Sequence, residues 1–174
     1  MRGVVSLVLQ CFAAAVYAEL DAEDTGGVQQ NYIEKPYVWE ELDAALPGYP
    51  QKKNLVDLGI ATDGMQYTVY LDKPSLLMGE DGVVRYTVVL VSNSDVWNVS
   101  HEGLRCGEKQ YRRYAYGANE KFQPLNNSPW RDVRGSGANR YRRILYEQYF
   151  CNPMRPYKSA EEMIGRFSEN WHEM

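Results

Sequence analysis

The residues of this chain best suited to binding chemistry are arginines interleaved with tyrosines. Between Arg105 and Arg143 there are ten basic and three acidic residues, which gives this segment a formal charge of +7. A guanidinium donates a planar fork of hydrogen bonds that matches a carboxylate or a phosphate, and a tyrosine ring stacks on sugars and on other rings. The segment therefore predicts a basic, aromatic surface that binds anions. The side chains expected to carry this binding are Arg112, Arg113, Tyr114, Arg131, Arg140 and Arg143.

A second interpretation of the same charges is intramolecular. Residues 19–57 contain nine acidic residues and three lysines, and so carry a formal charge of −6. On this interpretation the arginines are solvated outer positions that pair in part with the acidic region of their own chain. Nucleic acid is not an expected partner on either interpretation, because the whole chain carries a net charge of −4.

Residues suited to catalysis or metal binding are sparse, since the sequence contains two histidines, His101 and His172. Nucleophilic catalysis needs a histidine that faces its nucleophile, but Ser100 and His101 point to opposite faces of the strand predicted around them. We therefore interpret His101 as a hydrogen-bonded strand residue and predict no metal site and no cofactor. A hydrolase working through carboxylates is an alternative, which requires two acidic groups of shifted pKa in one pocket.

The elements that must hold these residues are predicted from the spacing of apolar side chains. Residues 36–50 predict a helical turn or two that docks onto the main body, because helical spacing relates Trp39, Leu42, Ala45 and Leu46. Residues 55–117 predict a β-meander, in which the tripeptide Asp72-Lys73-Pro74 separates the first two strands. The strands are expected over 65–71, 75–78, 83–92, 96–105 and 110–116, with short polar turns that make neighbours antiparallel.

Two helices are predicted after this sheet. In the first, over residues 138–150, Tyr141, Leu145, Gln148 and Tyr149 share an apolar stripe. The second follows Ser159, which has the spacing of an N-cap in a capping box. The predicted fold class is therefore α+β, an antiparallel meander sheet with the C-terminal helices packed on one face.

Residues 1–18 have the pattern of a secretory signal peptide. Arg2 precedes an apolar run, and Val16-Tyr17-Ala18 forms a small-x-small cleavage site. The run is too short to span a bilayer comfortably, so we predict cleavage after Ala18 and no transmembrane span, with a retained anchor as the alternative. Residues 19–35 are acidic and without periodicity, and predict a flexible lead-in. Residues 36–174 are expected to form a single domain.

Two of the three cysteines, Cys106 and Cys151, lie in the predicted mature chain. In the oxidising compartment that export implies, they most simply pair with each other. A metal pair or a reactive thiol is the alternative, although neither has supporting neighbours. The predicted disulfide ties the end of a strand to the end of the first helix and so holds that helix against the sheet.

An ordered set of motifs in the mature chain resembles a known protein family. The set comprises GVVRYTVV at 82–89, EGLRC at 102–106 and YRRYA at 111–115, followed by Phe122, Trp130 and Cys151. It resembles the CNP1-like family of exported β-proteobacterial proteins, and the similarity covers roughly residues 36–170. The resemblance implies a periplasmic or envelope protein of a Gram-negative bacterium, and it implies no enzyme activity, cofactor or catalytic residue.

These observations favour a non-catalytic binding or accessory protein of the periplasm, associated with the envelope. The expected partner is an anionic envelope component, namely a lipid head group, lipopolysaccharide, an acidic glycan or an acidic protein. The alternatives are the carboxylate hydrolase described above and a structural or chaperone-accessory role, which a large exposed apolar patch would indicate.

Overall fold

The structure of the chain is a computed structural model that describes residues 38–43, 45–60, 67–134, 137–151 and 159–169. All of them belong to the second of two units, Met1–Tyr37 and Val38–Met174. The predicted signal peptide (1–18) and flexible lead-in (19–35) lie outside the described residues. Within those residues, no helix combines the length and the apolar character needed to cross a membrane.

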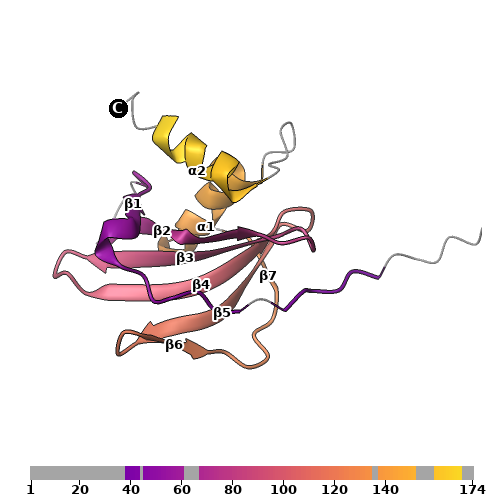
Figure 1. Cartoon of the computed structure of the whole chain (residues 1–174), viewed down its shortest axis with the longest axis horizontal. Coiled ribbons are helices and arrows are strands. Elements are labelled where there is room, and N and C mark those ends of the chain that lie inside the picture. Colours follow the sequence, from indigo (N-terminus) through magenta and orange to yellow (C-terminus); the bar gives the residue numbers. More distant parts are fainter. Residues whose placement is uncertain (1–37, 44, 61–66, 135–136, 152–158, 170–174) are drawn as a thin grey trace, which may run out of the picture. The chain divides into compact units, whose positions relative to one another are not determined.

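Six strands follow one another across one antiparallel sheet in the order of the sequence (Figure 1). A seventh short strand, β7 (Arg131–Asp132), pairs with the beginning of the fifth. Because the turns that join the long strands are short, each strand hydrogen-bonds to the next one along the chain. The predicted meander and the α+β class are confirmed. The six strands are β1 (Leu55–Asp57), β2 (Tyr67–Met78), β3 (Val83–Ser92), β4 (Trp97–Arg105), β5 (Gln110–Ala118) and β6 (Lys121–Pro124).

Strand β2 is continuous where the sequence predicted two strands. The expected break at Asp72-Lys73-Pro74 is a register shift between Asp72 and Leu77 within one strand. Pro74 has no N–H to donate to a sheet ladder, so an irregularity is expected there. Ser75 restores the connection across it, because its Oγ accepts a hydrogen bond from the Thr87 N–H at 2.7 Å and donates to the Asp72 carbonyl at 2.6 Å.

The C-terminal helices cover one face of the sheet (Figure 1). The 3₁₀ turn η2 (Gly137–Asn139), helix α1 (Arg140–Ile144) and the π-helix η3 (Leu145–Phe150) are continuous, and α2 (Ala160–Glu169) follows. Tyr141, Leu145, Tyr149 and Phe150 are buried in one core with Tyr86 and Leu104 of the sheet. Gln148, predicted on the same stripe, is exposed, because the wider π-helical turn places the next buried positions at 149 and 150.

Two local predictions about the helices are confirmed. Ser159 caps α2, since its Oγ accepts a hydrogen bond from the Glu162 N–H at 3.3 Å. The disulfide between Cys106 and Cys151 is formed, with an S–S distance of 2.02 Å. It joins the residue after β4 to the residue after η3 and so fastens the helices to the sheet.

The opposite face of the sheet is crossed by residues 38–50, which we call the strap. The helical turn predicted here is wrong, because the described strap residues form neither helix nor strand. Trp39 and Glu41 instead are half-buried and contact the sheet, whereas Val38, Glu40 and Leu42 are exposed. This two-residue alternation is typical of an extended segment, and contacts to the sheet override the local helical spacing.

Candidate functional site

The six predicted binding residues do not form one surface, because β5 separates them. Arg112 and Arg113 are neighbours on this strand, so their side chains point to opposite faces of the sheet. Arg112 and Tyr114 lie under the strap, and both hydrogen-bond to Glu41. Arg113 points to the helix face, where its Nε lies 3.6 Å from an oxygen of Glu102.

Glu102 is the centre of a buried polar network on the helix face. Its carboxylate is inaccessible to solvent and receives two hydrogen bonds from Arg142, at 2.7 Å from Nε and 2.5 Å from Nη2. The hydroxyls of Tyr141, Ser100 and Tyr86 donate to the same carboxylate at 2.9, 2.6 and 3.2 Å. Burial alone would raise the pKa of Glu102, but Arg142 and these hydrogen bonds outweigh it and hold the pKa below its ordinary value. Glu102 is therefore ionised and anchors Arg142.

Beside this network lies a hollow of about 370 Å³. Its lining combines arginines with tyrosines and small polar groups, and contains no carboxylate among the described residues. Because Arg142 and Arg113 share the single negative charge of Glu102, a net positive charge remains, and 44% of the Arg113 side chain is exposed. The residues of the lining that carry this chemistry are Arg113, Arg142, Tyr67, Tyr116, Tyr141, Ser100 and Asn139.

A smaller hollow of about 130 Å³ adjoins the same arginine, since Arg113 lines both. Tyr111, Ser128 and Arg131 contribute to its wall. Of the six residues expected to bind an anion, the structure thus places Arg113 and Arg131 in one hollow, and Arg142, which was not among those six, lies beside Arg113 in the other. We call the two hollows together the Arg113 hollow.

The remaining predicted residues lie elsewhere on helix α1. Arg143 is exposed and Arg140 is half-buried, and neither belongs to the lining of the Arg113 hollow. The Nε of Arg140 is buried and has no hydrogen-bond partner among the described residues. The six residues of the sequence prediction thus divide between the two faces of the sheet and the helix.

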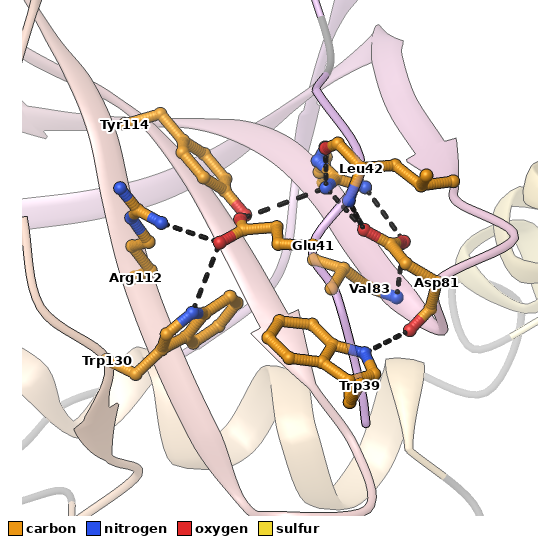
Figure 2. A network of polar contacts seen from close by, with 9 residues as sticks. Trp39, Glu41, Leu42, Asp81, Val83, Arg112, Tyr114 and Trp130 are labelled. Atoms are coloured by element: carbon orange, nitrogen blue, oxygen red, sulfur yellow. Dashed lines mark hydrogen bonds and ion pairs between the residues drawn. The ribbon is translucent and has the colours of Figure 1, made fainter. Parts of the chain in front are cut away.

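On the face of the sheet opposite the helices, the Glu41 carboxylate of the strap accepts hydrogen bonds from three side chains (Figure 2). The Arg112 Nη1 donates to its carboxylate at 2.5 Å, the Tyr114 hydroxyl at 2.6 Å and the Trp130 Nε1 at 3.3 Å. The Arg85 Nη2 lies 3.8 Å away. We call Arg112, Tyr114 and Trp130 the carboxylate clamp. Arg112 is thus paired within the chain, as the intramolecular interpretation predicted.

The backbone and the aromatic side chain of the strap are held as well (Figure 2). Leu42 donates its N–H to Asp81 Oδ2 at 2.9 Å, and its carbonyl accepts from Arg85 Nη2 at 2.7 Å. The Trp39 indole donates to the Asp81 carbonyl at 2.9 Å and lies 3.7 Å from the Arg105 guanidinium, in cation–π geometry. Burial would raise the pKa of Asp81, but Arg85 and the backbone N–H groups hold it below its ordinary value.

His101 lies in the floor of the cavity beside Glu41, which has a volume of about 280 Å³. Its Nδ1 is 3.1 Å from the Thr87 hydroxyl, and burial, reinforced by Arg85, lowers its pKa to about 4. Ser100 lies on the opposite face and donates to Glu102. The interpretation of His101 as a hydrogen-bonded strand residue is confirmed.

Comparison with known proteins bears on the whole chain. The model of the CNP1-like family matches residues 34–168. The chain belongs to the CNP1-like family. It is 23% identical to Cryptic neisserial protein 1 of Neisseria gonorrhoeae over 190 residues, an alignment that covers 97% of this chain and 93% of that protein. No solved structure matches the chain. The family resemblance drawn from the motifs is confirmed.

The residues of this CNP1-like protein that the sequence prediction missed are Glu41, Glu102 and Arg142. Glu102 carried a signal, because it is a charged residue at the inward position of a predicted strand, alternating with Ser100 and Leu104. Glu41 carried none, since the residues that bind it lie 71 to 89 positions away.

The carboxyl groups of the CNP1-like protein bear on the hydrolase alternative. Burial raises the pKa of Asp72 to about 6, but Asp72 does not line the cavities described above. Glu41 and Asp43 line the 280 Å³ cavity, where Glu41 is engaged by the carboxylate clamp. Within the described part of the chain, no three histidine, cysteine or acidic residues are placed to hold a metal ion. The hydrolase alternative stays a prediction.

Proposed function

We propose that this CNP1-like protein is an exported, non-catalytic binding protein of the periplasm that holds an anionic envelope component in the Arg113 hollow. The observation that carries the proposal is the lining of this hollow. It contains two arginines, several tyrosines and no described carboxylate, and 44% of the Arg113 side chain is exposed. Arg113 and Arg142 share the single carboxylate of Glu102, so an anion that enters meets a net positive charge.

The chemistry of the lining favours a sugar that carries a phosphate or a carboxylate. The Arg113 guanidinium matches such a group, because its N–H donors form a planar fork. Tyr67 and Tyr116 are both more than a third exposed and offer ring faces to a sugar. Lipopolysaccharide and acidic glycans present this combination, whereas a bare lipid head group uses the charge alone.

The periplasmic location rests on two features. Residues 1–18 have the n-region, apolar run and cleavage site of a secretory leader. The Cys106–Cys151 disulfide is a bond that persists in oxidising compartments such as the bacterial periplasm.

Co-sedimentation of the purified mature chain with isolated envelope fractions tests the proposal. We expect binding at low salt that weakens at high salt, because screening reduces attraction between exposed charges. Arg113→Glu should reduce the bound fraction at least tenfold. Arg134→Glu is the matched control, because Arg134 is 86% exposed and lies outside both parts of the Arg113 hollow.

Equal losses for the two variants would mean that overall charge, rather than the Arg113 hollow, holds the envelope component. Absence of binding at either salt concentration would remove the proposal.

A further inference from the structure

The strap lies on the sheet in the manner of a bound peptide. Three features of an extended peptide are recognised at once: the Trp39 side chain, the Glu41 carboxylate and the peptide groups of Leu42. The groups that bind them belong to β3, β4 and β5, to Asp81 in the turn before β3 and to Trp130, which precedes β7. Side-chain pockets for alternate residues, together with hydrogen bonds to the backbone, are the usual elements of a peptide-recognition groove.

The carboxylate clamp is built into the sheet. Arg85, Gly103 and Arg112 are register partners across β3, β4 and β5. Gly103 leaves the space that the Tyr114 ring occupies, since a Cβ there would lie 2.6 Å from the Tyr114 hydroxyl. The Arg112 guanidinium lies 5.5 Å from the centre of the same ring. Two of the three donors are thereby positioned by strand neighbours rather than by the strap.

Charge and space both favour an exchangeable occupant. The sheet contributes Arg85 and Arg112, and Asp81 balances the first of them. The negative charges that face this pair from the strap are Glu41 and Asp43. We call the surface under the strap, formed by Arg85, Arg105 and the carboxylate clamp, the groove. Without the strap, this groove carries a net positive charge. The cavity of about 280 Å³ beside Glu41 provides additional room.

We propose that this groove binds an extended acidic segment of a partner protein, containing an aromatic residue two positions before a glutamate, and that the strap is its built-in competitor. The partner segment places its glutamate in the carboxylate clamp and its aromatic ring against Arg105, and the strap leaves. The inference goes beyond the proposed function, because it uses the opposite face of β5 and does not depend on Arg113.

A partner segment must displace the strap from the groove before it can bind. A tethered occupant has an effective concentration on the order of millimolar, so a free peptide binds the wild-type chain weakly. A change that weakens docking of the strap but leaves the carboxylate clamp intact must therefore strengthen the binding of a separate peptide. Glu41→Gln does this, because it keeps the shape of the side chain and removes its charge.

The experiment measures, by fluorescence anisotropy, the binding of a labelled peptide to the full mature chain. The peptide has the sequence of residues 38–43, VWEELD. Glu41→Gln should bind this peptide at least tenfold more tightly than the wild type. Glu40→Gln, the matched control at an exposed neighbouring acid, should bind as the wild type does. The double variant with Glu41→Gln and Arg112→Ala should bind the peptide at least tenfold more weakly than Glu41→Gln alone.

A second peptide separates recognition of the glutamate from general attraction of charge. Replacing the second glutamate of the peptide by glutamine should weaken binding at least tenfold, and replacing the first should change it less than threefold. Equal binding by Glu41→Gln and the wild type, equal binding of both peptides, or absence of binding to folded Glu41→Gln overturns the proposal.

A measurement on the wild-type chain gives an independent result. The Leu42 amide is hydrogen-bonded to Asp81 in the docked strap, so its hydrogen exchange should accelerate several-fold as the peptide saturates the groove. An unchanged rate at saturation overturns the exchange of strap for peptide. Arg113→Glu should leave both peptide results unchanged while it reduces envelope binding, so the two proposals fail separately.

Discussion

Breaking the Glu102–Arg142 pair from either side should destabilise the protein strongly. Both side chains are at most 3% exposed, and the two hydrogen bonds between them are 2.7 and 2.5 Å long. Glu102→Gln keeps the size of the side chain but leaves the Arg142 charge buried without its counter-ion. Removal of one partner from a buried pair costs about 3–5 kcal/mol, which is a large part of the roughly 5–15 kcal/mol that stabilises a domain.

The same reasoning predicts that the two single changes are not additive. Arg142→Met should also cost about 3–5 kcal/mol, because it leaves the buried Glu102 carboxylate without its close counter-ion, with the half-exposed Arg113 at 3.6 Å as the remaining cation. The double variant contains neither charge, so its cost should fall below the sum of the single costs by about 2–3 kcal/mol. The hydroxyls of Tyr141, Ser100 and Tyr86 contact an uncharged amide in both variants that carry Glu102→Gln.

Urea unfolding of the disulfide-bonded mature chain at pH 7, followed by far-UV circular dichroism, measures these costs. Asp132→Asn and Arg134→Met provide a control cycle on an exposed ion pair, for which little coupling is expected. If the costs of Glu102→Gln and Arg142→Met add, or if each is below about 1 kcal/mol, the account of a coupled buried pair is wrong.

Three further predictions concern stability. Because the pKa of His101 is about 4 in the folded chain against an ordinary value of 6.5, stability should fall by up to about 3 kcal/mol as the pH drops from 6.5 to 4, and His101→Gln should remove this part of the pH dependence in urea titrations. The pKa of Asp72 is raised to about 6, so its contribution is present below about pH 4 and is lost as the pH rises to 6. Asp72→Asn should therefore raise the melting temperature at pH 7 and not at pH 3.5, and an equal rise at both values would contradict this. Replacing Cys106 and Cys151 by serine opens a loop with a sequence separation of 45 and should cost up to about 4 kcal/mol in the same assay, whereas an unchanged unfolding midpoint would show that the bridge contributes nothing.

The sheet was predictable because its signals are local. Alternating side chains and four-residue polar turns define β3, β4 and β5 within about two residues of their observed ends. The opposite orientation of Arg112 and Arg113 followed from the same alternation, once strand β5 had been predicted. Grouping the two as one surface was therefore an avoidable error.

The strap and the clamp were not predictable in this way. Trp39, Leu42 and Leu46 have helical spacing, but the contacts that determine the strap conformation come from residues about 40 to 90 positions away. Such contacts override a weak local preference. The Glu102–Arg142 pair is separated by 40 residues, and its partner choice depends on how α1 packs on the sheet.

Hydrogen exchange of the mature chain with and without lipopolysaccharide tests the central claim most directly, because it locates the bound anion. We predict slower exchange in the segments that line the larger part of the Arg113 hollow, residues 97–100, 113–117 and 139–142, and unchanged exchange in the strap. Arg113→Glu should abolish the protection. Protection confined to the strap face, or protection that survives Arg113→Glu, would contradict the assignment of the anion site to the Arg113 hollow.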